Sequence, residues 1–243
     1  MRSSSTTLNN TKVYNSSTKT SLADQVTITC YTDPLCCWSW AMKPALDNIR
    51  QQFGNSLSWQ YCMAGLIPSW ENYVDSTNSV SRPFQMGPVW MHASKVSGVP
   101  IDSNLWFRDP PASSYPACIA FKSVQLQSAE YAKAYLDLLW ENCMGGGVNI
   151  SRQSTLVDIA RQLQLTYPGF DINEFENSLV DGIGLEAFKA DIRETKENNI
   201  TRLPALILRQ AGKASLFIMG YKSYDYLLDV IQQLLSAENS AIK

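Results

Sequence analysis

The chain has 243 residues, which suffices for one large domain or two small ones. It is 45% hydrophobic and 17% charged with a net charge of −2, the profile of a folded protein with a sizeable core. This balance argues against nucleic acid or an anionic membrane as the main partner, because both call for a basic excess. Residues 1–24 are rich in Ser, Thr and Asn and lack the apolar run of a secretory signal, so we expect a flexible tail and a cytoplasmic protein.

The cysteines are too few and too scattered for a disulfide scaffold, so in a cytosolic chain most of them are expected to be small buried apolar residues. Two of them are adjacent and call for a separate interpretation. The six are Cys30, Cys36, Cys37, Cys62, Cys118 and Cys143.

A β-α-β unit opens the ordered part of the chain. Val26–Tyr31 is β-branched and ends before Asp33-Pro34, which predicts a strand. Helical apolar spacing follows over Cys37–Phe53, with a kink expected at Pro44. Ser58–Met63 predicts a second strand, so the crossover between the two strands should be right-handed.

The segment 64–112 is irregular and punctuated by prolines, but it carries large aromatic residues. These are too apolar for a free linker, so we expect this segment to pack against the body of the protein. A short helix is predicted over Pro88–Ser97, because proline opens it and Gly98 closes it. His92, the only histidine, is expected to be an ordinary polar residue on this helix.

The segment 114–199 is predicted to be helical, with Ser114 as an N-cap residue and Gly145–Gly147 as a hinge. Thr155-x-x-Asp158 resembles a capping box, and Asp171-x-x-Glu174 is expected to open a short helix. The first two helices of this segment are predicted over Tyr115–Ala129 and Glu130–Met144.

The chain closes with a β-β-α unit. Two strands, Ala205–Leu208 and Ser215–Met219, form a hairpin, and an amphipathic helix follows over Tyr224–Leu235. Together the two units predict an α/β protein with a thioredoxin-like fold, in which a mixed four-stranded sheet (β-α-β … β-β-α) carries an all-helical insertion. We predict a thioredoxin-like domain from residues 25–63 and 200–238, interrupted by an aromatic-rich loop and helical insertion over 64–199.

Two local features fit the thioredoxin plan. Cys36 lies at the start of the first helix, where unpaired backbone N–H groups and the helix dipole are expected to lower its pKa. Leu203-Pro204 precedes the third strand, and in this fold that peptide bond is cis. The Leu203 backbone would then be free to pair with an extended substrate beside Cys36.

The segment from Tyr31 to Ala41 resembles the active-site region of the DsbA-like, FrnE-like thioredoxin proteins, and the likeness covers about residues 26–237. That family usually carries Asp-Pro-x-Cys-Pro-Trp-Cys-x-Trp, so its second cysteine falls on Ser39 and its first intervening proline on Cys37. A dithiol enzyme releases its substrate by attack of the second thiol, which Ser39 cannot perform. We therefore predict a single-cysteine site in which Cys36 and Ser39 are catalytic.

Two related groups accommodate such a site. Monothiol glutaredoxins use Cys-x-x-Ser with glutathione as the external resolving thiol. Kappa-class glutathione transferases and 2-hydroxychromene-2-carboxylate isomerases share the helical insertion and carry Ser-Pro-Tyr-Ser at the corresponding position. The resemblance therefore implies glutathione, or another low-molecular-weight thiol, as a co-substrate rather than a permanently bound cofactor. The residues expected to bind it or a substrate are Cys37, Trp38, Leu203 and Pro204.

Three functions remain open from the sequence. The leading interpretation is a thiol–disulfide oxidoreductase or protein-disulfide isomerase that acts on a protein or small-molecule disulfide through Cys36. The alternatives are a non-enzymatic adaptor that delivers client proteins to a protease, and a glutathione-dependent transferase or isomerase. No metal site is expected, because adjacent cysteines lack the usual ligand spacing and one histidine is present. The oligomeric state stays undetermined.

Overall fold

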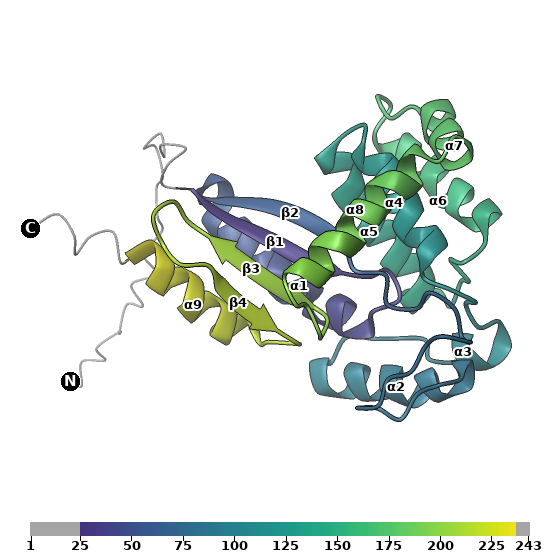
Figure 1. Ribbon diagram of the computed structural model, residues 1–243, viewed down its shortest axis with the longest axis horizontal. Coiled ribbons are helices and arrows are strands. Elements are labelled where there is room, and N and C mark those ends of the chain that lie inside the picture. Colours follow the sequence, from purple (N-terminus) through teal and green to yellow (C-terminus); the bar gives the residue numbers. More distant parts are fainter. Residues whose placement is uncertain (1–24, 237–243) are drawn as a thin grey trace, which may run out of the picture.

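The computed structural model describes residues 25–236, so the predicted N-terminal tail lies outside the described residues. A four-stranded sheet with the order β2-β1-β3-β4 forms one half of the molecule (Figure 1). β1 pairs in parallel with β2 and antiparallel with β3, and β3 pairs antiparallel with β4. The strands are β1 (Val26–Thr32), β2 (Leu57–Met63), β3 (Ala205–Arg209) and β4 (Leu216–Met219).

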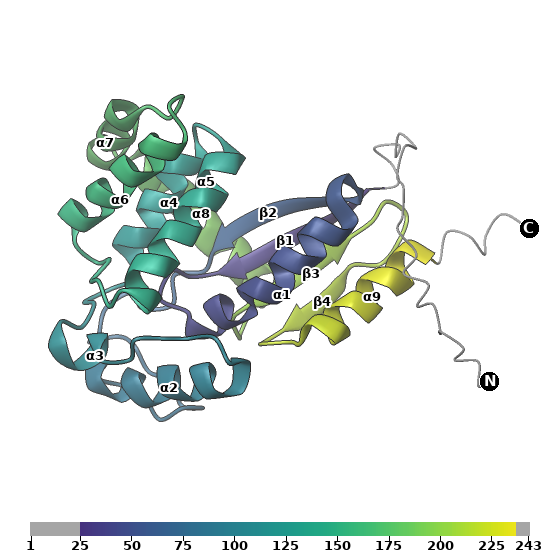
Figure 2. The same ribbon diagram turned by 180° about the vertical axis from the view of Figure 1, so that it is seen from behind.

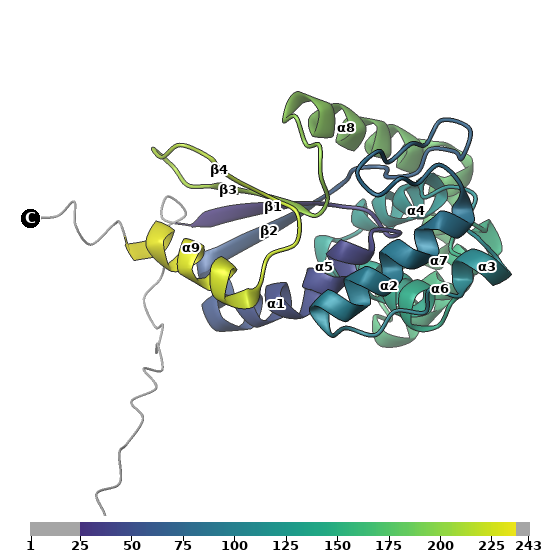
Figure 3. The same ribbon diagram turned by 90° about the horizontal axis from the view of Figure 1, so that it is seen from below.

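Helices cover both faces of this sheet. α1 (Cys37–Phe53) and α9 (Tyr224–Ser236) lie on one face, and α8 (Ile183–Glu197) lies on the other (Figure 3). On the α1 side, Ile28, Met42 and Leu206 belong to one buried apolar cluster, whereas Tyr31 and Cys62 belong to a smaller cluster on the α8 side. The alternation of side chains along each strand explains this division. The predicted thioredoxin-like fold is confirmed.

The helical insertion lies between β2 and β3 (Figure 2). It contains most of the largest apolar core, to which Trp90 and Trp106 contribute fully buried rings. The expectation that the 64–112 segment packs against the body is therefore confirmed. No helix within residues 25–236 has the length and apolar character needed to cross a membrane. The remaining helices are α2 (Met86–Ser97), α3 (Leu105–Arg108), α4 (Tyr115–Gln125), α5 (Ala129–Trp140), α6 (Gln153–Thr166) and α7 (Ile172–Val180), with a π-helical turn over Glu141–Gly145 and 3-10 turns over Gly54–Ser56 and Pro83–Gln85.

Several of the local helix predictions differ from the structure, including the start of α2, which lies at Met86 and not at Pro88. α4 ends at Gln125, four residues earlier than expected, and α5 then begins behind the N-cap Ser128. Thr155 lies inside α6 instead of starting it, so the first capping-box prediction is wrong. The second is confirmed in position, because the Asp171 side chain accepts hydrogen bonds from the N–H groups at the start of α7. The glycine triplet closes the turn after α5, and its role as a hinge stays a prediction.

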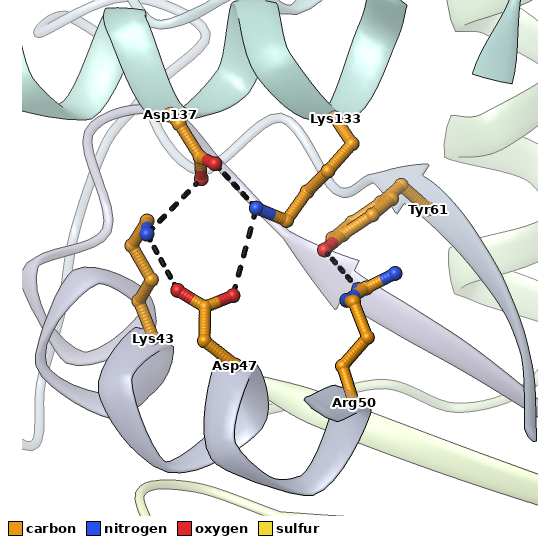
Figure 4. A network of polar contacts seen from close by, with 6 residues as sticks. All are labelled: Lys43, Asp47, Arg50, Tyr61, Lys133 and Asp137. Atoms are coloured by element: carbon orange, nitrogen blue, oxygen red, sulfur yellow. Dashed lines mark hydrogen bonds and ion pairs between the residues drawn. The ribbon is translucent and has the colours of Figure 1, made fainter. Parts of the chain in front are cut away.

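An ion-pair clamp joins the insertion to the thioredoxin half (Figure 4). Lys43 and Asp47 on α1 face Lys133 and Asp137 on α5, and each lysine contacts both carboxylates. The pairs between the two helices are Lys43 Nζ to Asp137 at 3.6 Å and Lys133 Nζ to Asp47 at 3.5 Å. The side chains are 19–35% exposed, so solvent only partly screens them. The clamp fixes how the insertion sits on α1.

Candidate functional site

The turn that connects β1 to α1 positions Cys36. Its backbone N–H donates to the Asp33 carbonyl at 2.9 Å, and its own carbonyl accepts from the N–H of Ser39 at 3.0 Å. Cys36 has an extended conformation with φ −81° and ψ 101°, and helical geometry begins at Cys37. Cys36 is therefore the N-cap residue of α1, as the sequence predicted.

The Asp33 carboxylate holds this turn to the insertion. One oxygen accepts the Leu35 N–H at 2.8 Å, and the other accepts the Leu66 N–H at 2.6 Å, the Ser114 hydroxyl at 2.7 Å and the Cys118 thiol at 3.4 Å. Asp33 is fully buried, and burial raises its pKa against the opposing effect of these four donors. The Asp33 side chain thus joins its own turn to two distant segments, the loop at Leu66 and the start of α4.

Ser114 has a different role from the predicted one. It stands at the N-cap position of α4, but its side chain makes no capping hydrogen bond. Its hydroxyl donates to Asp33 and accepts the Ile67 N–H at 3.0 Å. A buried carboxylate is the stronger acceptor, which explains why this hydroxyl points away from its own helix.

The Cys36 thiol is buried, with 4% of the residue exposed. Burial raises its pKa to about 11, and the side chain and backbone of Ser39 lower the pKa by less than burial raises it. The prediction of a pKa lowered by the helix N-terminus is therefore wrong. Cys37 is equally buried, belongs to the core of the insertion, and has a pKa well above its ordinary value for the same reason.

α2 and its flanking loops form a cap that contacts α1 beside Cys36. α2 packs against the first part of α1, and His92 on α2 meets the Trp38 ring edge-on with centroids 5.6 Å apart. Tyr221 lies on another side of the Trp38 ring, at 5.7 Å. The Trp40 indole N–H donates to the Pro100 carbonyl at 3.2 Å, which fixes the loop after α2 to α1. Trp38 therefore contacts both the cap and the chain that follows β4.

The remaining site residues, Leu203 and Pro204, directly precede β3 and face opposite sides of the sheet. The Leu203-Pro204 bond is cis, as predicted, and Pro204 and Ser39 line one cavity of about 20 Å³. That volume is comparable to one water molecule. Leu203 packs on the other face of the sheet, against the cluster that contains Tyr31. Glutathione or another small thiol at this site stays a prediction.

A second cluster of acidic and thiol groups lies between α8 and β2. Ligand atoms of Cys62, Asp191 and Glu194 lie within 4.8 Å of one another. Their hydrogen-bonding capacity is already used: Lys122 donates to Asp191 at 2.8 Å and the Tyr31 hydroxyl donates to Glu194 at 2.6 Å. The buried ammonium group supplies the positive charge that a metal ion would supply, so this cluster serves as a fixed contact between α8 and the sheet.

The thioredoxin family model matches residues 30–229. The chain belongs to the thioredoxin family. Two solved structures show the same fold: a putative protein disulfide isomerase from Nitrosomonas europaea (19% identity, 90% of this chain and 100% of that chain, TM-score 0.71) and a probable DsbA oxidoreductase from Streptomyces coelicolor (14%, 86% and 90%, TM-score 0.66). At these identities the likeness shows the fold alone, and it confirms the expected DsbA-like architecture.

The curated relatives have a different function from the leading expectation. The ClpXP adapter protein SpxH of Halalkalibacterium halodurans is 23% identical over 84% of this chain. This chain spans 66% of that relative's length. Proteins with the same name from Bacillus subtilis and Bacillus cereus are 24% identical over 86% of the chain. These relatives are adapters, which overturns both our main prediction of a thiol–disulfide oxidoreductase and the prediction that the chain is an enzyme.

The sequence located Cys36 at the start of α1 and the cis bond before Pro204, but it missed the residues that contact this region. Asp33 was recognised only as part of the turn and of the family motif, and His92 only as an ordinary helix residue. Their partners are distant in the sequence: Asp33 bonds Ser114, and His92 contacts Trp38. Asp33 directly follows an apolar strand and has no lysine or arginine beside it in the sequence. A carboxylate in such a place indicates a buried, hydrogen-bonded side chain, and this was the available signal for Asp33.

Proposed function

We propose that this protein is a non-enzymatic adaptor that presents a client protein to the ClpXP protease. The observation that carries the proposal is its similarity, over 84% of the chain, to a ClpXP adapter protein. The chain spans about two thirds of that relative, which is consistent with an adaptor built on the thioredoxin-fold part. An adaptor and its protease share a compartment, which for this proposal is the cytoplasm expected from the composition.

The environment of Cys36 supports an adaptor over a catalyst. The attacking species in disulfide exchange is a thiolate, and a pKa of about 11 leaves the thiol almost entirely protonated at neutral pH. With 4% of the residue exposed, a protein disulfide has no direct approach to the sulfur. The Cys36 environment thus fits a structural role under the cap.

The cap offers apolar side chains for contact with a protein. Phe107 is 62% exposed, Met91 59% and Phe84 52%, although neighbouring tryptophans of the same segment are fully buried. Phe107 lies against Gly87, where a Cβ would collide with its ring, so the exposed ring is held on the surface of α2. Exposed aromatic and methionine side chains are enriched at protein interfaces.

The proposal is tested with ClpXP purified from the organism that encodes this chain. Extract proteins are incubated with ClpXP and ATP, with and without the chain, and their decay is followed by quantitative mass spectrometry. We expect a small set of proteins to decay faster with the chain, and equally fast with Cys36→Ser. Unchanged decay of every protein, or loss of the effect in Cys36→Ser, would contradict a non-enzymatic adaptor.

A further inference from the structure

β4 lies at the edge of the sheet and has open backbone groups on its outer side (Figure 1). The strand order gives β4 one strand neighbour, β3, within residues 25–236. The Gly220 N–H donates to the Pro204 carbonyl at 2.7 Å. Hydrogen-bonded pairs alternate with non-bonded pairs along an antiparallel ladder, so Ile218 also bonds β3. The N–H and C=O groups of Phe217 and Met219 therefore point away from β3, and no other group of the described residues bonds them.

The β4 edge lacks the devices that usually keep an edge strand from pairing. The strand Leu216–Met219 contains no charged residue and no proline, and it pairs with β3 residue for residue, without a bulge. Phe217 lies opposite Ile207 on the α8 side of the sheet, but α8 packs against β2 at the other edge, and Phe217 is 48% exposed. An apolar edge strand with open backbone groups is a ready site for the addition of a further strand.

The chain around this edge is basic, although the whole protein has a net charge of −2. Residues 198–223 contain no aspartate or glutamate, and their basic residues are Arg202, Arg209, Lys213 and Lys222. Within residues 25–236, none of these side chains forms an ion pair. Lys213 precedes β4 and bonds a backbone carbonyl of α9, whereas Lys222 follows β4 and lies over an aromatic ring. Each end of the edge strand thus carries a positive charge that no carboxylate neutralises.

These charges distinguish a foreign strand from a second copy of the chain. Two copies that pair through β4 about a twofold axis run antiparallel, which brings Lys213 of one copy beside Lys222 of the other at both ends of the strand. Like charges that face each other across a sheet are destabilising. A foreign strand with acidic residues at its ends meets the same lysines as opposite charges. The occupant that fits is therefore an extended, apolar segment with acidic ends.

β4 leads toward the cap beside Cys36. The Tyr221 ring, directly after β4, lies 5.7 Å from that of Trp38, and Trp38 also contacts His92 of the cap. The cap exposes apolar side chains, among them Met91, which is 59% exposed. A protein segment that pairs with β4 therefore lies next to a second apolar surface.

We propose that β4 binds an extended segment of the client protein as an additional strand of the sheet. The segment pairs with the backbone of Phe217 and Met219, places an apolar side chain on the Phe217 ring, and brings acidic residues close to Lys213 and Lys222. Each of the two outward-facing residues offers one donor and one acceptor, so the added strand forms about four backbone hydrogen bonds. The inference rests on the proposed adaptor function, because it assigns the segment to a client.

The direct test uses the full chain and three peptides. The acidic peptide is acetyl-Glu-Thr-Val-Thr-Val-Thr-Val-Thr-Glu-amide, the basic peptide has lysine at both ends instead, and the methylated peptide is the acidic one with every valine and threonine N–H methylated. NMR measures affinity and amide hydrogen exchange. With the acidic peptide, we expect the N–H groups of Phe217 and Met219 to exchange at least about tenfold more slowly. We expect the basic peptide to bind about fivefold more weakly and the methylated peptide to leave exchange unchanged.

This comparison needs no variant and refutes the proposal in three ways. Binding of the methylated peptide as tightly as the acidic one would show that side chains dock without strand pairing. Exchange at Phe217 and Met219 that the acidic peptide does not slow would place binding elsewhere. Equal affinity of the basic peptide would contradict an occupant with acidic ends.

Variants locate the interaction on β4. Phe217→Pro removes an N–H that β3 does not use, so we expect the strand to persist and the acidic peptide to bind at least about tenfold more weakly. The matched variant Phe217→Val keeps the N–H and should weaken binding only about threefold. Lys222→Gln should weaken it about threefold, whereas Lys189→Gln, at an exposed lysine of α8, leaves it unchanged. Equal affinities of Phe217→Pro and Phe217→Val would contradict backbone pairing. A dimer that Phe217→Pro dissociates would show that a second copy occupies the edge instead.

The two proposals fail separately. If the acidic peptide does not pair with β4 but the chain still accelerates decay of proteins by ClpXP, the assignment of β4 is wrong and the adaptor function stands. If the peptide pairs as expected but no protein decays faster, the adaptor function is wrong and the strand-binding edge stands. If Phe217→Pro slows client decay much more than Phe217→Val does, both are supported.

Discussion

Removal of the Asp33 carboxylate is expected to loosen the turn before Cys36 from the insertion. Asp33→Ala leaves four buried donors without their acceptor. The Ser114 hydroxyl can turn to the Ile67 carbonyl, which already lies 3.5 Å away, and the thiol of Cys118 is a weak donor. The backbone N–H groups of Leu35 and Leu66 are fixed and stay unsatisfied.

These two unsatisfied backbone N–H groups determine how much stability the Asp33→Ala variant loses. Each unsatisfied buried N–H costs about 1–3 kcal/mol, so Asp33→Ala should lower the free energy of unfolding by about 2–6 kcal/mol. Asp33→Asn keeps one side-chain oxygen, which is best placed to accept the hydrogen bonds from Leu66 and Ser114. The amide NH₂ group then faces the N–H of Leu35. One donor then faces another, and the expected loss is about 1–3 kcal/mol.

Urea denaturation followed by tryptophan fluorescence measures these losses. Asp158→Asn provides the control, because Asp158 is an exposed carboxylate, 67% accessible, that pairs only with Arg161. Its loss should stay below about 1 kcal/mol. If both Asp33 variants unfold within about 0.5 kcal/mol of the parent, the buried carboxylate does not hold the turn and the reasoning from its four donors is refuted.

Three further predictions concern groups elsewhere in the chain. Because burial raises the pKa of the Cys36 thiol to about 11, its iodoacetamide labelling near pH 7 should be about a hundredfold slower than that of an ordinary thiol and should rise toward pH 11; labelling at the ordinary rate would contradict the burial. Lys133→Met should cost about 1 kcal/mol at low salt and little at about 1 M NaCl, since it breaks the partly exposed pair with Asp47; a loss that does not change with salt would contradict an electrostatic clamp. Lys122→Met should cost about 3–5 kcal/mol near pH 7, because it leaves Asp191 charged and buried. Burial already holds the pKa of Asp191 above its ordinary value, so the folded protein gains stability from the protonated carboxyl. That gain is complete below the ordinary pKa and is lost as the pH rises through the folded-state pKa. The stability deficit of Lys122→Met should therefore shrink in denaturation curves at lower pH, and a deficit that is constant with pH would count against this account.

The amino-acid sequence by itself determined the order of elements and the place of Cys36 in it. Val26–Thr32 forms a strand because β-branched residues predominate there, and α1 begins after Cys36 because Asp33-Pro34 cannot continue the strand. Leu203-Pro204 was located correctly for the same reason: the residues that specify these features are neighbours in the chain. Local patterns of this kind do not depend on what packs around them.

Only the tertiary structure decided what kind of site this is. The helix N-terminus at Cys36 predicted a low thiol pKa, but the folded chain leaves only 4% of this residue exposed. Loss of solvation outweighs the hydrogen bonds from Ser39 at the start of α1, so the pKa rises instead. Burial and charge at a site depend on contacts between distant segments, which no local pattern encodes.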